Sequence, residues 1–223
     1  MKAIFFLLLF LGVFLWRETG MAQERIPLPE PERRGAMSVE ETISRRRSVR
    51  SFEDRALTLR DLSQLLFAIQ GMTDHGYGLR TVPSAGALYP LEVYAVVGKV
   101  EGVAEGVYRY HPEGHELERT AMGDKRIALY KSALYQESIR EAPLLLVLSA
   151  FYERTTRKYG ERGIRYVHME AGHAAQNVYL QAEALGLGTV VIGAFRDTEV
   201  ARVLGLPENE VPLYLMPVGK PRR

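Results

Sequence analysis

The sequence contains no cysteine, and its charges nearly cancel. Without cysteine, the chain can form no disulfide framework, no thiolate metal site, no iron–sulfur cluster and no cysteine nucleophile. Its 29 Lys and Arg residues exceed its 27 Asp and Glu residues by only two, so the chain as a whole lacks the basic surface that nucleic acid requires. Because 47% of the 223 residues are apolar, a disordered tail is excluded and a packed domain is expected.

Motifs of several enzyme classes are absent as well. The sequence has no Gly-x-Ser-x-Gly elbow of hydrolases, no Walker loop, and no Gly-x-Gly-x-x-Gly fingerprint after a predicted strand. Its histidines are also spaced wrongly for a metal ion. His168 and His173 point about 140° apart on a helix, and a proline and a glycine interrupt the interval between His111 and His115. We therefore predict no metal site.

One long apolar run occurs, at residues 3–16. As a helix it would span about 21 Å, less than the roughly 30 Å hydrocarbon core of a bilayer, so it is typical of an export signal. Small residues before Gln23 permit cleavage there. We interpret residues 1–22 as a signal peptide or an uncleaved membrane anchor and expect an exported, periplasmic or membrane-anchored protein. A translation start at Met21 would instead give a cytoplasmic protein.

The rest of the chain divides into a strap and one domain. Residues 23–37 are rich in proline, which fixes φ and removes backbone donors, so an extended strap is expected. The domain is expected over residues 38–223. Ser38 with Glu41 forms a capping box for its first helix, whose apolar face would carry Val39 and Ile43.

Further patterns predict a layered α+β domain, an α/β sandwich. Thr58 caps a second helix that Gly71 ends, and Asp124 and Asp197 open shorter ones. Apolar residues recur at intervals of three and four over Ile164–Leu185, which predicts a long buried helix with an alanine-rich face. The predicted strands lie at residues 93–97, 107–110, 116–119, 144–148, 189–192 and 211–218.

A basic cluster at residues 45–50 contains four arginines and Ser48. It has two interpretations. Cations are favoured at a helix carboxyl terminus, so the cluster is typical of a solvated helix end. Guanidinium groups also bind phosphate through paired hydrogen bonds, and a serine hydroxyl adds a further donor. The spacing alone leaves both open.

Five motifs, in order over about residues 27–223, resemble the nitroreductase-like FMN flavoproteins. They are RRSVRSF at 46–52, PSAGALYP at 83–90, VYRYH at 107–111, RYVHMEAGHAAQN at 165–177 and PVGKPR at 217–222. Together they are similar to the SagB-type branch, which includes dehydrogenases that oxidise azolines to azoles in peptide-toxin maturation.

The resemblance implies both an architecture and a chemistry. It implies a central mixed sheet flanked by helices, and a homodimer that binds FMN between its subunits. The implied function is that of an FMN-dependent oxidoreductase, with two-electron hydride transfer at flavin N5 in a ping-pong cycle. The substrate would be a small molecule or a peptide, and NAD(P)H is one candidate electron donor. The alternative is a non-catalytic flavin- or ligand-binding protein of the same fold.

The resemblance also implies roles for individual residues. Arg46, Ser48 and Arg222 would hold the FMN phosphate, and Arg50 would face the pyrimidine edge of the flavin. Segment 83–86 would lie along the ring, where Gly86 permits close approach of the backbone. Backbone amides at 192–194 would face N5 and O4. The full implied cofactor set is Arg46, Arg47, Ser48, Arg50, Pro83, Ser84, Ala85, Gly86, Leu88, Ile192, Gly193, Ala194 and Arg222.

The pair Lys158 and Tyr159 has two interpretations. A basic and an aromatic residue in this setting are commonly a solvated helix face with one packed ring. Azoline-oxidising relatives carry a Lys-Tyr pair at the matching point, which implies that Lys158 and Tyr159 are catalytic and take the substrate proton. Those relatives also carry a long amino-terminal peptide-clamp domain where this chain has about 35 residues before its first predicted helix, and this difference argues against ribosomal-peptide processing.

Overall fold

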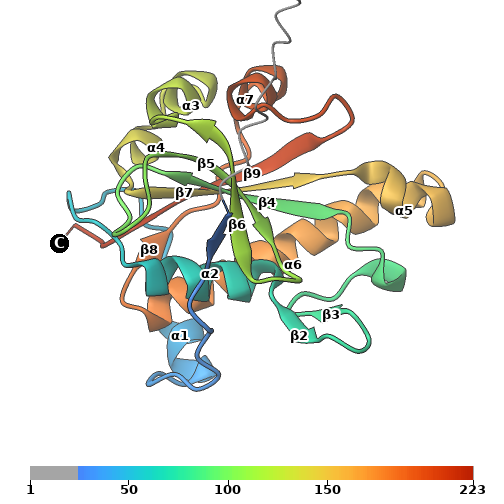
Figure 1. Cartoon of the computed structure of the whole chain (residues 1–223), viewed down its shortest axis with the longest axis horizontal. Helices are drawn as coiled ribbons and strands as arrows, with labels where there is room; N and C mark the ends of the chain where they lie inside the picture. Colours follow the sequence, from blue (N-terminus) through green and yellow to red (C-terminus); the bar gives the residue numbers. More distant parts are fainter. Residues whose placement is uncertain (1–24, 223) are drawn as a thin grey trace, which may run out of the picture.

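A computed structural model describes residues 25–222, which form a sheet covered by helices on both faces (Figure 1). The seven-stranded sheet has the order β1-β6-β5-β4-β7-β9-β8. Its strands are β1 (Arg25–Pro27), β4 (Leu91–Val97), β5 (Gly106–His111), β6 (Glu116–Met122), β7 (Leu144–Ala150), β8 (Gly188–Thr189) and β9 (Val211–Gly219). Neighbouring strands pair antiparallel, and isolated parallel bridges join Ser48 to Thr189 and Leu57 to Val100. The sheet is thus mixed, with an antiparallel centre.

Seven α-helices are found within residues 25–222. They are α1 (Val39–Arg45), α2 (Leu59–Gln70), α3 (Arg126–Ser132), α4 (Glu137–Glu141), α5 (Tyr152–Tyr159), α6 (Arg162–Ala184) and α7 (Asp197–Leu204). A 3-10 turn, η1 (Ala85–Ala87), and a small hairpin of β2 (Met72–Asp74) and β3 (Leu79–Arg80) complete the domain. Figure 1 places α2 and α6 on one side of the sheet and α3, α4 and α7 on the other.

Two apolar cores hold these layers together. Successive side chains of a strand point to opposite faces, so β4 and β7 supply both cores. Val93 and Leu146 pack on the face covered by α2 and α6. Val96 and Leu145 pack on the face covered by α3, α4 and α7. The predicted α+β layered sandwich is confirmed.

Most helices begin or end at the residues that the local sequence signals predicted. Ser38 and Thr58 each form a complete capping box, with Glu41 and Asp61 respectively, and Gly71 ends α2. The predicted long helix is confirmed as α6, and Gly186 after it has a φ of +65°. These signals are reliable because a cap satisfies backbone groups within a few residues of itself.

Three details differ from the sequence-based expectations. Val39 and Ile43 do not pack inward, since they are 62% and 56% exposed. The strand expected at 189–192 shortens to the two residues of β8, because the Val191 N–H donates to the Tyr179 hydroxyl instead of to a neighbouring strand. The helix expected at Asp124 begins two residues later, and the carboxylate of Asp124 accepts a hydrogen bond from the first helical N–H.

The proline-rich segment lies along the edge of the domain. Strand β1 pairs with β6, the Leu28 N–H donates to the His115 carbonyl, and the Ser63 hydroxyl donates to the Pro29 carbonyl. Within residues 25–222, we find no helix that combines the length and apolar character needed to cross a bilayer. The predicted signal or anchor at residues 1–22 lies outside the described residues.

Candidate flavin site

Arg46, Ser48 and Tyr179 form one cluster, which we call the Arg46 group. The guanidinium carbon of Arg46 lies 5.2 Å from the centre of the Tyr179 ring, and the hydroxyls of Ser48 and Tyr179 are 3.2 Å apart. Helix α6 supplies the tyrosine. The segment after α1 supplies the other two and is held to the sheet by a bond from the Val49 N–H to the Thr189 carbonyl. A surface guanidinium beside a hydroxyl is suited to an anion such as phosphate.

The neighbouring Arg47 points elsewhere. One of its terminal nitrogens lies 3.1, 3.2 and 2.8 Å from the carbonyl oxygens of Ser44, Arg45 and Arg46, so its guanidinium caps the carboxyl end of α1. Cations stabilise a helix at this end. Each interpretation of the basic cluster therefore applies to a different arginine. Arg47 stabilises the helix end, whereas Arg46 keeps donors that could bind phosphate.

Several donors nearby are uncommitted. The Arg50 guanidinium is exposed and has no hydrogen bond or ion pair with another described residue. Gly193 and Ala194 follow a bridge between Ile192 and Leu215, and no described residue accepts a hydrogen bond from either N–H. Both are exposed, so these amides are available to a ligand.

Arg222 contacts neither Arg46 nor Ser48. Its terminal nitrogen donates to the Phe52 carbonyl at 2.6 Å and lies 3.4 Å from the Glu141 carboxylate. The nearby Lys220 donates to the Gly186 carbonyl at 3.0 Å. Lys220 was not selected from the sequence, although it lies within the last of the five motifs.

Five of the implied flavin residues lie on the loop that precedes β4, which we call the Pro83–Tyr89 loop. They are Pro83, Ser84, Ala85, Gly86 and Leu88. The backbone of this loop is unusual, because φ is +64° at Gly86, +54° at Ala87 and +44° at Tyr89. Residues other than glycine rarely adopt such values, and clusters of them are typical of functional sites.

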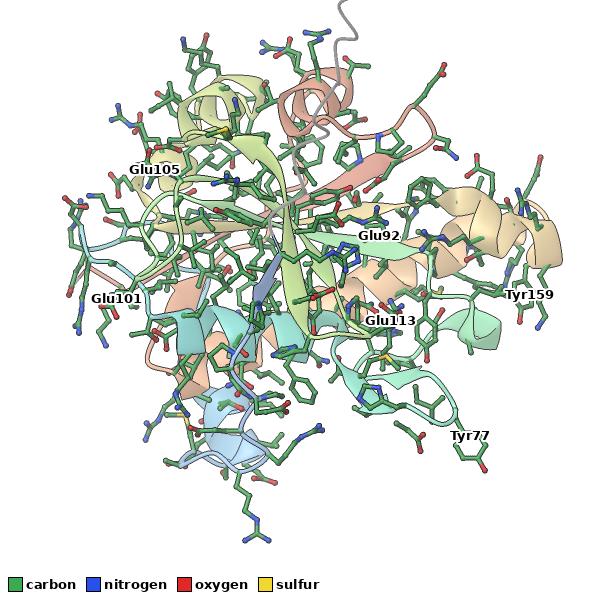
Figure 2. The ribbon with its side chains drawn as sticks, in the orientation of Figure 1. Tyr77, Glu92, Glu101, Glu105, Glu113 and Tyr159 are labelled. Atoms are coloured by element: carbon green, nitrogen blue, oxygen red, sulfur yellow. The ribbon has the colours of Figure 1, made fainter. Side chains whose placement is uncertain are left out.

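Lys158 and Tyr159 end over this loop. A Cβ added to Gly86 would lie 2.8 Å from both the Lys158 Nζ and the Tyr159 hydroxyl, so a side chain at this position would displace their ends. The Tyr159 ring packs edge-on against Tyr166, with 5.2 Å between ring centres, and Figure 2 shows Tyr159 at the end of α5. The two side chains are therefore directed at the loop that the resemblance assigns to the flavin.

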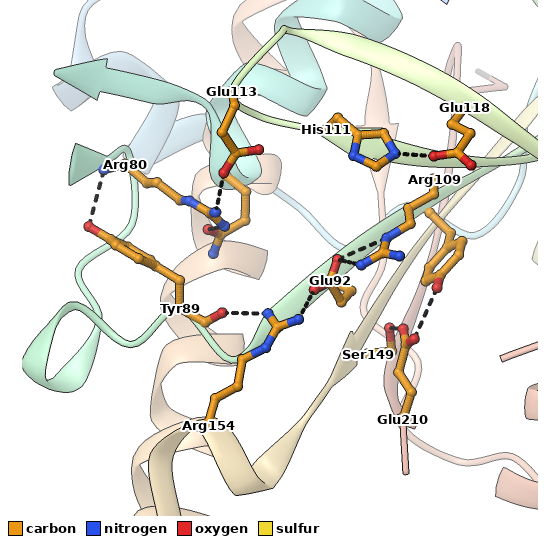
Figure 3. Close-up of polar contacts among 12 residues, drawn as sticks. Arg80, Tyr89, Glu92, Arg109, His111, Glu113, Glu118, Ser149, Arg154 and Glu210 are labelled. Atoms are coloured by element: carbon orange, nitrogen blue, oxygen red, sulfur yellow. Dashed lines mark hydrogen bonds and ion pairs between the residues drawn. The ribbon is translucent and has the colours of Figure 1, made fainter. Parts of the chain in front are cut away.

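A charged network joins α5 to the same loop (Figure 3). The Arg154 guanidinium donates to the Tyr89 carbonyl at 3.0 Å and pairs with Glu92 at 2.6 Å. The other carboxylate oxygen of Glu92 accepts two hydrogen bonds from Arg109, at 2.8 and 3.1 Å. Because Arg154 and Lys158 are four residues apart on α5, they lie on one face of the helix. Arg154 thus fixes the turn of α5 that precedes Lys158.

Residues 43–220 match the model of the nitroreductase family. The chain belongs to this family. A nitroreductase-type protein of Methanocaldococcus jannaschii is 52% identical over 195 residues, which are 87% of this chain and 96% of that protein. The microcin B17-processing protein of Escherichia coli is 33% identical over 73% of this chain and 62% of its own length. A crystal structure of a nitroreductase homologue from Ralstonia eutropha superposes with a TM-score of 0.80, at 32% identity, over 92% of each chain.

These comparisons confirm the resemblance and the nitroreductase fold. The homologues of this nitroreductase-family chain include a peptide-processing protein, as the SagB-type motifs led us to expect. The microcin relative is longer than the matched region, so its activity is not transferred by the match.

One polar residue of this family member was missed from the sequence. Glu170 is 4% exposed on the inner face of α6, and its carboxylate accepts a hydrogen bond from the Ala85 N–H at 2.8 Å. Burial raises the pKa of Glu170, and hydrogen bonds from Ala85 and Ser84 oppose that shift. A sequence signal existed, since position 170 falls on the apolar stripe that Val167 and Ala174 define.

Two further features define the limits of the site. Within residues 25–222, no three histidine or carboxylate side chains converge where they could hold a metal ion. A cavity of about 740 Å³ lies among α1, α2 and α6 and includes Phe67, Asn177 and Leu180. None of the implied flavin residues lines it.

Proposed function

We propose that the chain is an FMN-dependent oxidoreductase. The observation that carries the proposal is the free donor set at the end of the sheet, where Arg50, Gly193 and Ala194 have no acceptor among the described residues. Such groups fit the electron-rich edge of a flavin, and the Arg46 group fits its phosphate. FMN, when bound, would supply two-electron redox chemistry at N5 in a ping-pong cycle between two substrates.

Individual residues would have distinct tasks. Arg46 and Ser48 would bind the phosphate, while Arg50 would stabilise negative charge on the pyrimidine edge. The amides of Gly193 and Ala194 would donate hydrogen bonds to the ring. Arg222, held by Phe52 and Glu141, would contribute its remaining donors only if it turns towards the phosphate.

The layout of the two clusters supports a homodimer. Tyr179 of the Arg46 group and Glu170 beneath the Pro83–Tyr89 loop are nine residues apart on α6, which is about 13.5 Å along the helix axis. Within the described residues, no hydrogen bond or ion pair joins the Arg46 group to the Pro83–Tyr89 loop. A second copy, placed along α6, would bring its loop to the Arg46 group of the first. Exposed apolar side chains at Val39, Ile43 and Met169 are available for that interface.

Lys158 and Tyr159 would act on the substrate. Their ends lie over Gly86, so either group could take a proton from a substrate placed on the loop. The resemblance of the Lys-Tyr pair to that of azoline-oxidising dehydrogenases supports substrates of the azoline type. The similarity to a microcin-processing protein supports peptides as well as small molecules within that class. NAD(P)H is an alternative donor of electrons to FMN, and with either donor the opposite half-reaction needs an electron acceptor that reoxidises the flavin.

The amino-terminal segment carries a separate proposal. We propose that residues 1–22 direct export and that the mature protein begins near Gln23, because an apolar run at 3–16 has no place on a soluble surface. Amino-terminal sequencing of protein from fractionated cells checks this. Soluble cytoplasmic protein that begins at Met21 would contradict it.

Flavin absorbance tests the central proposal. We expect purified full-length protein to be yellow, to bleach with dithionite and to regain its colour with an artificial acceptor such as a quinone. Arg50→Gln should weaken FMN binding, whereas Arg55→Gln, also an exposed arginine, should not. Protein that binds FMN but exchanges no electrons would favour the non-catalytic alternative, and colourless protein that takes up no added FMN would overturn the proposal.

A further inference from the structure

Glu170 is buried without a charged partner of the usual kind. It lies on the inner face of α6 among Val167, Ala171 and Ala174, and within the described residues no lysine or arginine forms a salt bridge with it. His173, three residues further on, weakly favours the charged form of the carboxylate. Burying a carboxylate in such surroundings opposes folding, so a purely structural reason for Glu170 is lacking.

The carboxylate is directed at the backbone of the Pro83–Tyr89 loop. It accepts a hydrogen bond from the Ala85 N–H at 2.8 Å, and the neighbouring Ser84 side chain favours its charged form. The Ser84 hydroxyl oxygen in turn accepts the Tyr89 N–H at 2.9 Å. The carboxylate therefore connects the start of the loop, at Ala85, to α6, and Ser84 connects that start to Tyr89 at its other end.

The backbone of this loop needs such support. Gly86, Ala87 and Tyr89 all have positive φ, and two of them carry side chains that disfavour it. Backbone of this kind persists only where surrounding contacts fix it. Arg154 of α5 holds the Tyr89 end of the loop, and Glu170 of α6 holds the Ala85 end.

We propose that Glu170 is a positioning residue that holds the Pro83–Tyr89 loop in the shape that receives the flavin ring. The inference rests on the proposed FMN function for the identity of the ligand, but the anchoring itself is a property of the protein alone. The chain retains an unfavourable buried carboxylate because the loop would otherwise relax away from its strained shape. Function and stability therefore make opposite demands at this position.

Because function and stability make opposite demands at position 170, an experiment can distinguish a positioning role of Glu170 from a purely structural one. Methionine at position 170 matches the length of glutamate and suits an apolar surround, so Glu170→Met should leave the melting temperature of the FMN-free protein unchanged or raised. It should weaken FMN binding at least tenfold, as measured by quenching of flavin fluorescence. Glu170→Gln, which keeps an acceptor oxygen, should lose less FMN affinity than Glu170→Met. Glu183→Gln is the matched control, because Glu183 is also on α6 and its side chain contacts no described partner.

Amide hydrogen exchange supplies a readout that does not depend on FMN. In the FMN-free protein, residues 84–89 should exchange faster in Glu170→Met than in the parent, while the centre of α6 stays protected. Unchanged exchange in the loop would overturn the proposal. A Glu170→Met protein that melts earlier and loses protection throughout α6 would also overturn it, by showing a structural role. If the parent binds no FMN but the loop exchanges faster in the variant, the anchoring stands and only the proposed function fails.

Discussion

In the Arg46 group the candidate phosphate-binding side chains stand on backbone with ordinary geometry, whereas the Pro83–Tyr89 loop has strained backbone that buried and charged partners fix in place. Arg46 and Ser48 need only the end of α1 and one bridge to β8 to position them. The loop needs Glu170 from α6 and Arg154 from α5. The difference teaches that a flexible anion can be bound by free side chains, while a rigid ring needs a preformed surface.

The largest expected effect separates chemistry from binding at the loop. Lys158→Ala should slow flavin reduction by a model azoline by about 10² to 10⁴, the usual contribution of a positioned proton acceptor. Flavin reoxidation by a quinone needs no such base and should be unchanged. The control is Arg157→Ala, which removes an exposed cation of α5 that has no described partner. Full activity of Lys158→Ala in both half-reactions would make the pair a surface feature.

Glycine at position 86 tests whether the loop must leave room for the pair. Gly86→Ala should lower azoline oxidation by up to about 100-fold, because the new Cβ would lie 2.8 Å from the ends of Lys158 and Tyr159 and displace them. Gly78→Ala is a close control, since Gly78 has a φ of +65° and open space around it. Both variants should lose about 1 to 2 kcal/mol of stability from the positive φ. Equal activity losses in the two would show that strain alone matters.

At the other cluster, neighbouring arginines provide their own control. Arg46→Ala should weaken FMN binding by about 10- to 100-fold, the value of a charged hydrogen bond of about 1.5 to 3 kcal/mol. Arg47→Ala should change the affinity little, because one terminal nitrogen of its guanidinium is engaged by the carbonyls of Ser44, Arg45 and Arg46 at the end of α1. Titration of FMN-free protein decides between them. Similar losses of FMN affinity in both variants would contradict the assignment of phosphate binding to Arg46 and of helix capping to Arg47.

The same contrast explains how much could be predicted from the sequence. The Arg46 and Lys158 motifs are short and local, and the caps at Ser38 and Thr58 act over three residues, so their patterns are visible in the chain. The long helix was visible because its apolar stripe repeats for six turns.

The anchors of the loop could not be predicted in this way. Glu170 and Ala85 are 85 residues apart, and Arg154 and Tyr89 are 65 apart, so only the folded chain brings each pair together. Exposure of Val39 and Ile43 was missed for a related reason, since an apolar helix face does not say whether its partner lies within the same chain. Tertiary contacts decide both features.

The smallest expected effect is a pH dependence of stability. Of the two regions, the Pro83–Tyr89 loop with Glu170 should contribute to it and the Arg46 group should not. Burial raises the pKa of Glu170 above its ordinary value of 4.5, so the folded protein holds this proton over a pH range where the unfolded chain has released it. The stability that the protonated form contributes is therefore lost as the pH rises through the raised pKa. The hydrogen bonds from Ala85 and Ser84, together with His173, limit how far the pKa of Glu170 is raised. Glu170→Met has no such group. Its advantage in melting temperature over the parent, both without FMN, should be small near pH 4.5, grow as the pH rises and then level off. An advantage that stays constant with pH would mean that Glu170 is not held with a raised pKa, and the contrast between the two clusters would then rest on backbone geometry alone.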